Sequence, residues 1–371
     1  MVKKIFTLNF LDSFVFGVTT IAIPLLMLER NISIAAIGLV FSLAPIAKML
    51  VRLAAAGLAD AAGERWFYVL NGLANFFQSV AYALSNSPLG FGLGKAIDGA
   101  RESFIWAVNR STIFSQQPER RHFATASMVS GRAVYFAFGS LAVGLLFPFG
   151  GYVPVLVFCA VIGLAMAAIS LSVKNTQHRE RVRLSDFSLL GRERRFYETV
   201  GAITFGSSFY MVILYLMVPI FFKLSGYPTE QIGLLYAIYF LIFGVAMNLL
   251  SHRKVSSRWS AIIGAVIFIL SLFGMGFAPA GLVPYFFLFM AVGDAHLGVN
   301  WEEIIYLQAT RTRKRATEIA LIHVPSSIAI FLLTGISGFI VEQYGFAPLF
   351  VFGAATLAIF AWWSLRLSKM K

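Results

Sequence analysis

The sequence has little of what a soluble enzyme or a secreted protein needs. Its 371 residues include one cysteine, Cys159, which excludes an internal disulfide and a cysteine-based metal motif. The five histidines show no metal-ligand spacing, and neither a G-x-S-x-G nucleophile motif nor a G-x-x-x-x-G-K-[ST] nucleotide-binding loop occurs. We therefore expect no catalytic residues, no metal, no cofactor and no ATP hydrolysis, and we interpret the protein as not being an enzyme.

Charged residues are also scarce. They make up 13% of the chain, whereas hydrophobic residues make up 58% and include 37 Phe, which is typical of a membrane protein. Apolar runs of about 18 residues or more predict membrane spans, because about 20 helical residues cross a hydrocarbon core of about 30 Å. Such runs lie at about 5–27, 33–55, 67–86, 90–112, 123–147, 153–173, 198–222, 230–250, 260–278, 284–308, 317–340 and 346–366.

The positions of the basic residues explain the net charge of +13. Only Arg30 and Lys223 lie on one side of the predicted topology, and most of the other basic residues outside the spans lie on the opposite side. By the positive-inside rule this opposite side is cytoplasmic. We therefore exclude nucleic acid as a partner. We expect a monomeric, multi-pass protein in the lipid of a prokaryotic plasma membrane, with both termini in the cytoplasm.

The two halves of the chain resemble each other. NFLDSF at 9–14 aligns with TFGSSF at 204–209, and at the same offset Pro24 aligns with Pro219. The repeat predicts a duplicated six-span unit, whose copies are related by an axis along the membrane normal because six is an even number. We therefore expect an all-α membrane protein with 12 transmembrane helices in two six-helix bundles. The predicted bundles are 1–173 and 198–371, joined by a solvated cytoplasmic linker at 174–197.

The loop after the second predicted span matches a known motif. In AGLADAAGER (56–65), Leu58, Asp60, Gly63 and Arg65 fit the pattern small-x-Leu-x-Asp, two further residues, Gly and a basic residue. With this motif and its six-plus-six plan, the chain resembles the major facilitator superfamily of secondary transporters. The resemblance implies a site between the bundles that opens alternately to the two sides of the membrane. It also implies that Asp60, Gly63 and Arg65 form a conformational latch.

The fourth predicted span contains a cluster of charges in the stretch GKAIDGARESF (94–104). Arg101 and Glu102 follow Asp98 by three and four residues, so all three share one broad helical face, which Lys95 extends by a turn. A charge at the bilayer centre costs at least about 2.5–3.5 kcal/mol on insertion scales, so this face should point into a wet cavity between the bundles. An internal ion pair that only fixes helix packing is the alternative.

The tenth predicted span contains the matching stretch GDAHLGVNWEE (293–303). Asp294 aligns with Glu102 in the repeat, so we expect these two acids to face each other. We expect the first, fourth, seventh and tenth spans to line the cavity. The predicted substrate- or proton-binding residues are Asp12, Lys95, Asp98, Arg101, Glu102, Arg132, Asp294, His296 and Asn300. Arg110 aligns with Glu302, which predicts a second gating pair at the inner ends of the two spans.

These features predict a secondary active transporter that moves a small solute by alternating access. The titratable groups near the site suggest proton coupling, because a carboxylate in a low-dielectric cavity takes up a proton more readily than one in water. The guanidinium groups of Arg101 and Arg132 favour an anionic or zwitterionic substrate, whereas the nearby acids would attract a cation. An uncoupled facilitator, a non-transporting membrane sensor and a lipid-modifying enzyme are the alternatives.

Overall fold

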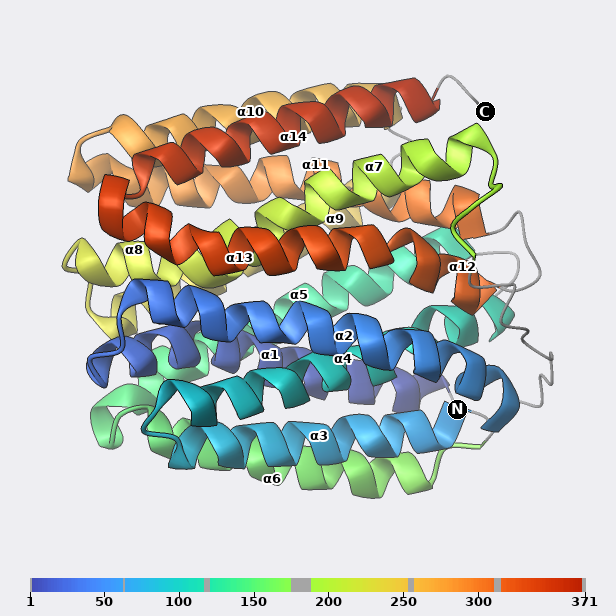
Figure 1. Cartoon of the computed structure of the whole chain (residues 1–371), viewed down its shortest axis with the longest axis horizontal. Coiled ribbons are helices and arrows are strands. Elements are labelled where there is room, and N and C mark those ends of the chain that lie inside the picture. Colours follow the sequence, from blue (N-terminus) through green and yellow to red (C-terminus); the bar gives the residue numbers. More distant parts are fainter. Residues whose placement is uncertain are drawn as a thin grey trace.

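The computed structural model of the chain describes residues 2–62, 64–116, 121–174, 188–252, 257–309 and 315–368 (Figure 1). Regular structure in these residues is entirely helical, which confirms the predicted all-α fold. The long helices of the first half are α1 Val2–Glu29, α2 Ile34–Ala62, α3 Glu64–Leu84, α4 Pro88–Gln116, α5 Arg121–Leu146 and α6 Tyr152–Leu171. The α-helices of the second half, of which α8 and α12 are short, are α7 Arg194–Phe209, α8 Val218–Leu224, α9 Thr229–His252, α10 Ser257–Phe277, α11 Val283–Ala309, α12 Arg315–Ile322, α13 Val324–Tyr344 and α14 Ala347–Ser368.

Two of the predicted spans are not single α-helices. The span predicted at 198–222 consists of α7, the π-helical segment η3 Tyr210–Met217 and α8. The span predicted at 317–340 consists of α12 and α13, with a break at His323. Within the described residues, ten helical segments are long and apolar enough to cross a membrane. α3 and α4 are not among them because their polar side chains lower the hydropathy, so the count of twelve spans stays a prediction.

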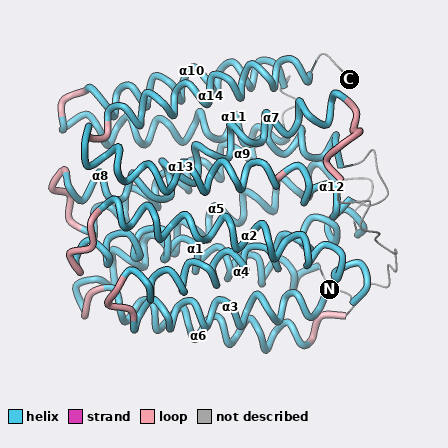
Figure 2. Tube along the Cα trace, viewed as in Figure 1, coloured by secondary structure: helices cyan, strands magenta, loops and turns pink. Residues whose placement is uncertain are grey.

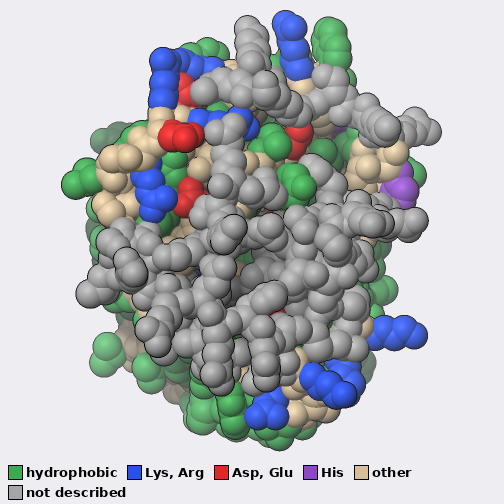
Figure 3. Space-filling model, turned by 90° about the vertical axis from the view of Figure 1, so that its right-hand side faces the viewer, with side chains coloured by type: hydrophobic (Ala, Val, Ile, Leu, Met, Phe, Trp, Pro, Cys, Tyr) green, Lys and Arg blue, Asp and Glu red, His purple; other side chains and the backbone are tan. Residues whose placement is uncertain are grey.

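The helices run along one direction, side by side, and both ends of the chain lie at the same end of the molecule (Figures 1 and 2). We call this the termini end and the opposite one the far end. Figure 3 shows the termini end, where Lys and Arg side chains stand at several places around the face and hydrophobic side chains flank it. Exposed hydrophobic side chains such as Leu93, Phe158 and Leu270 are the surface expected of helices that face lipid.

Most helix contacts stay within one half of the chain. In the first half α3 packs on α4 and α6, α2 on α4, and α1 on α5; in the second half α10 packs on α11 and α14, and α9 on α11. The most extensive contacts between the halves are those of α5 with α9 and of α2 with α13. These two helix pairs therefore hold the halves together.

The end of the predicted linker lies next to the second half of the chain. α7 begins at Arg194, so the last residues of the predicted linker are helical. In addition, Arg192 Nη1 lies 3.1 Å from Glu318 Oε2 in α12, and Gln308 Nε2 donates to the other oxygen of Glu318 at 2.8 Å. The buried carboxylate of Glu318 needs a cationic partner, and Arg192 provides it. This ion pair attaches the end of the predicted linker to the second half.

Glycines allow both helix pairs to approach closely at the far end. A Cβ atom on Gly233 of α9 would lie 2.7 Å from the carbonyl oxygen of Ser140 and 2.8 Å from the backbone nitrogen of Gly144, both in α5. A Cβ atom on Gly38 of α2 would lie 2.8 Å from the carbonyl oxygen of Thr334 in α13. The halves therefore touch backbone to backbone at this end.

We predict that Gly233→Ala destabilises the protein. The added methyl group meets backbone atoms that cannot move away separately, and overpacking of this kind costs about 1–3 kcal/mol. Thermal unfolding of the purified protein in detergent measures the effect. Gly281→Ala is the matched control, because no atom lies within 4 Å of a Cβ atom built at Gly281. An unchanged melting temperature for Gly233→Ala would contradict the close-packed seam.

Candidate functional site

A cavity of about 310 Å³ lies between the two halves of the chain. The first half lines it with residues of α1, α2, α4 and α5, and the second half with residues of α7, η3, α9, α11 and α13. The four spans that were expected to line the cavity all do so, together with the second, fifth, eighth and eleventh. The lining positions of α2 run from Phe41 to Arg52. They occupy the central part of α2, which begins at Ile34 and ends at Ala62.

The charges of the fourth predicted span belong to a buried chain of ion pairs. Arg101 Nη1 lies 2.5 Å from Asp12 Oδ1 of α1, and Arg101 Nη2 lies 2.9 Å from Asp98 Oδ1. Asp98 Oδ2 in turn accepts a hydrogen bond from Lys95 Nζ at 3.1 Å. The Asp12 and Arg101 side chains are 0% and 1% exposed, so neither is part of the cavity surface, whereas Lys95 and Asp98 reach it.

Three further side chains surround Asp12. Arg132 Nη2 of α5 lies 3.0 Å from Asp12 Oδ2, and two asparagines of α3, Asn71 and Asn75, donate to Oδ1 at 3.1 and 3.3 Å. The sequence reasoning missed both asparagines. Their spacing was the available signal, because Asn71, Asn75 and Gln78 recur at helical intervals on one face of α3, and all three are buried.

The cavity surface of the first half exposes a different set of charges. Lys48 Nζ lies 2.5 Å from Glu102 Oε2, and these side chains are 17% and 14% exposed. The Arg132 side chain is 12% exposed and lies over the Trp106 ring at 4.9 Å. Within the cavity these three groups are therefore the ones that a solute can reach most easily. The pairing of Lys48 with Glu102 could not be read from the sequence.

Asp294 is held by two tyrosines and not by a cation. The hydroxyl groups of Tyr210 in η3 and Tyr239 in α9 donate to its two carboxylate oxygens, the latter at 2.7 Å. Among the described residues, no Lys, Arg or His nitrogen forms an ion pair with it. Asp294 is 2% exposed and lines the cavity from the second half. Glu102 and Asp294 thus both line the cavity, and each has partners in its own half of the chain.

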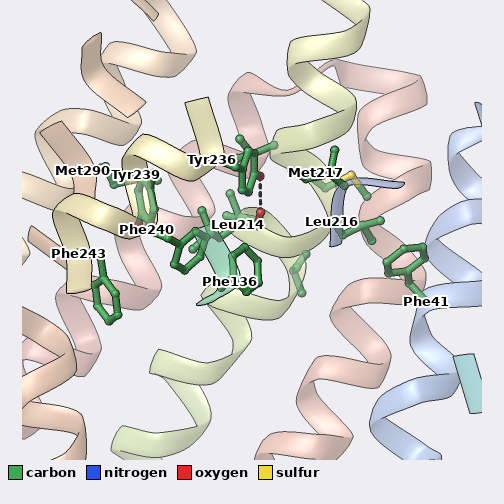
Figure 4. Close-up of a cluster of buried hydrophobic side chains, with 14 of the residues drawn as sticks. Phe41, Phe136, Leu214, Leu216, Met217, Tyr236, Tyr239, Phe240, Phe243 and Met290 are labelled. Atoms are coloured by element: carbon green, nitrogen blue, oxygen red, sulfur yellow. Dashed lines mark hydrogen bonds between the residues drawn. The ribbon is translucent and has the colours of Figure 1, made fainter. Parts of the chain in front are cut away.

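The π-helical segment η3 shapes the same wall. Its wider turn leaves one backbone carbonyl without the usual helical partner, and the carbonyl of Leu214 accepts a hydrogen bond from the Tyr236 hydroxyl at 2.6 Å, drawn as a dashed line in Figure 4. Tyr210 and Tyr215 of this segment line the cavity. Sequence periodicity could not reveal η3, because the same residues would also fit an α-helix.

Aromatic rings from both halves meet next to the charged groups. Phe136 of α5 and Phe240 of α9 have ring centroids 3.9 Å apart, and Figure 4 shows them side by side. The ring centroids of Phe16 in α1 and Tyr215 in η3 are 5.2 Å apart. These four residues line the cavity and contact one another across the boundary between the halves.

His323 lies at the break between α12 and α13. Its Nδ1 atom is 2.7 Å from the carbonyl oxygen of Ile319, and its own carbonyl accepts hydrogen bonds from the hydroxyl groups of Ser326 and Ser327. Pro325 follows the break and has no amide hydrogen to continue the helical pattern. His323 lies in the cavity wall.

Two predicted site residues lie elsewhere. His296 turns toward α10, where its Nδ1 atom is 3.0 Å from Ser260 Oγ. Asn300 is 1% exposed and donates to the carbonyl oxygen of His296 in its own helix. Neither lines the cavity, so the expectation that both face it is corrected. The positions 294, 296 and 300 were too widely spread around one helix to share a face.

Several gating residues lie outside the described part of the structure. This holds for Gly63 and for the side chains of Asp60 and Arg110, so both predicted latches stay predictions. Arg65 lies over the Trp66 ring at 5.1 Å, and Glu302 lines the cavity. No group of three or more His, Cys, Asp or Glu that could hold a metal ion is found among the described residues.

We predict that Arg101→Met destabilises the protein far more than Glu102→Gln. Removing one partner of a buried ion pair leaves an uncompensated charge and costs about 3–5 kcal/mol, and Arg101 serves two acids. The Lys48–Glu102 pair borders the cavity, so water can solvate the Lys48 ammonium group that Glu102→Gln leaves without its partner. Thermal unfolding of both variants in detergent tests this expectation. Equal losses of stability would mean that the two ion pairs do not differ in role.

Comparisons with known proteins agree with the fold. The sequence matches the Major Facilitator Superfamily over residues 5–301, and no match was found among curated protein sequences. The human organic anion transporter MFSD10 (TETRAN) has a similar structure, with a TM-score of 0.72, 12% identity and coverage of 98% of each chain. The nucleoside transporter NupG is also similar, with a TM-score of 0.71, 14% identity and coverage of 99% of each chain. The family and the fold indicate a multi-pass membrane transporter with a small-molecule substrate, not an enzyme. The chain belongs to the Major Facilitator Superfamily.

Proposed function

We propose that the protein is a secondary active transporter that moves a small solute by alternating access. Twelve transmembrane helices would form two bundles, 1–173 and 198–371, joined by the segment 174–197. The observation that carries the proposal is the central cavity, which both halves line with charged residues. A solute bound there contacts both bundles, so their relative movement can change the side from which the solute is reached.

The close contacts at the glycines of the α2/α13 and α5/α9 pairs support an inward-facing state of the transporter. The halves touch backbone to backbone at the far end, and the cavity lining of α9 runs from Phe240, near the middle of that helix, to Met247 on the termini side. With the termini in the cytoplasm, as the distribution of basic residues indicates, the cavity would face inward. The opposite state would then require the α2/α13 and α5/α9 seams to open.

We further propose that a proton drives transport through Asp294. An ionised carboxylate in a poorly solvated cavity is unfavourable unless a cation compensates it. Lys48 compensates Glu102, and Arg132 and Arg101 compensate Asp12. Asp294 has only tyrosine hydroxyl groups as partners among the described residues, so neutralisation by a proton is the compensation open to it. We therefore propose Asp294 alone, and not the pair of acids, for the coupling role.

A vesicle assay tests transport and coupling together. A thermal-shift screen of the purified protein against amino acids, nucleosides and organic anions supplies a ligand, because a compound that binds the folded state raises its apparent stability. The radiolabelled ligand is then followed into proteoliposomes. We expect accumulation above the equilibrium level when a pH gradient is imposed, and only equilibration without one. Equilibration under both conditions would identify an uncoupled facilitator.

We predict that Asp294→Asn abolishes accumulation but leaves exchange intact at saturating ligand. The amide keeps the shape of the side chain and loses the site for the proton. Glu102→Gln is the matched control, since it makes the same change to a carboxylate in the same cavity that already has a cation beside it. Accumulation that persists in Asp294→Asn would show that the coupling ion binds elsewhere.

A further inference from the structure

The two walls of the cavity differ in charge. The first half contributes the cations Lys48, Arg52, Lys95 and Arg132 and the acids Asp98 and Glu102. The second half contributes the acids Asp294 and Glu302, and no Lys or Arg of the described second half lines the cavity. Asp12 and Arg101 behind the first wall cancel each other. An excess of positive charge therefore faces an excess of negative charge across the bound solute.

The wall of the first half can bind an anionic group. Lys48 and Arg132 are the most exposed cations of this wall, with 17% and 12% of their side chains exposed. An ammonium group has three donors and a guanidinium has five, so the bonds to Glu102, Asp12 and Asn9 leave donors on both side chains. A carboxylate placed between them would complete their hydrogen bonding.

The wall of the second half can bind a cationic group at Asp294. Each carboxylate oxygen has two acceptor sites, and the Tyr210 and Tyr239 hydroxyl groups each occupy one. The remaining acceptor sites have no cation within ion-pair distance among the described residues. An ammonium group would supply the compensating charge that a buried carboxylate needs.

Aromatic side chains from both halves line the same cavity. Phe16 and Phe136 from the first half contact Tyr215 and Phe240 from the second, with ring centroids 3.9 to 5.9 Å apart. Tyr215 lies within electrostatic reach of Asp294 as well as of Glu102 and Arg132. A ring in the solute would stack here, since aromatic pairs contribute about 0.5–1.5 kcal/mol beyond the burial of area. The cavity of about 310 Å³ is small for a ligand site, which limits the solute to a compact molecule.

We propose that the solute is a compact zwitterion that carries an ammonium and a carboxylate group at opposite ends of an aromatic body. Asp294 binds the ammonium, Lys48 and Arg132 bind the carboxylate, and the aromatic residues pack on the body. This inference rests on the proposed transport function and specifies the substrate class of the same cavity. Since the ammonium binds ionised Asp294, solute and proton occupy this carboxylate in turn.

Three probes with the same ring test the proposal. They are 4-(aminomethyl)benzoate, which is a zwitterion, 4-methylbenzoate, which is an anion, and 4-methylbenzylamine, which is a cation. Titration calorimetry on the purified protein in detergent gives the three dissociation constants. We expect the zwitterion to bind at least tenfold more tightly than either singly charged probe. Equal or tighter binding of the anion or the cation, or no binding of the zwitterion, would overturn the proposal.

Two variants separate the two ends of the site. Asp294→Asn should weaken binding of the zwitterion and of 4-methylbenzylamine by tenfold or more and leave that of 4-methylbenzoate unchanged. The double variant Lys48→Gln, Glu102→Gln removes an ion pair without leaving a lone charge. It should weaken binding of the zwitterion and of 4-methylbenzoate and leave that of 4-methylbenzylamine unchanged. The reverse pattern, or equal losses for all three probes, would contradict the assignment.

The binding experiment does not depend on transport. If the zwitterion binds as expected but does not cross the membrane of proteoliposomes, the substrate class stands for the cavity and the proposed transport function fails. If vesicles transport a nucleoside or a purely anionic solute and the zwitterion does not bind, the transport function stands and the substrate class is wrong.

Discussion

The buried charge of Arg101 is the constraint on which the first half of the molecule depends. A guanidinium group that neither water nor lipid head groups can reach must be compensated by acids in direct contact, and Asp12 and Asp98 provide this contact. Asp12 also binds Arg132 of α5 and two asparagines of α3. One carboxylate and one guanidinium thereby fix the relative positions of α1, α3, α4 and α5, and the charged wall of the cavity rests on this frame.

The second half is built differently around the cavity. Its helices depart from regular α geometry at two places that line the site, the π-helical segment that contains Tyr210 and the break at His323. Hydrogen bonds from side chains replace missing backbone partners there, as the Tyr236 hydroxyl does for the Leu214 carbonyl. Irregular backbone at membrane depth is tolerated where protein surrounds it or where it lines a cavity. The first-half wall, which ion pairs hold together, thus faces a second-half wall with two irregular helical segments, at η3 and at His323.

Much of the fold could be predicted from the sequence, because the positions of helices follow from runs of apolar residues. The internal repeat and the loop motif at 56–65 were sufficient to indicate the family. The spacing of Asp98 and Arg101 predicted their shared face, and the structure adds that this face holds a buried ion pair. The alignment of Glu102 with Asp294 predicted two acids in one cavity, but not that Lys48 would neutralise only one of them. Such partners come from other helices, and their rotation about the helix axis is set by packing that hydropathy does not encode.

The pairing of charges in the first half has an electrical consequence. Lys95, Asp98, Arg101 and Asp12 form a set of two cations and two anions that move together with one bundle. Carrying a single charge across a membrane potential of 100 mV involves work of about 2.3 kcal/mol, whereas moving a neutral set along the membrane normal involves almost none. The membrane voltage therefore does almost no net work on these four side chains. Arg132, which also contacts Asp12, lies outside this neutral set, so the voltage acts on it as well as on a charged solute.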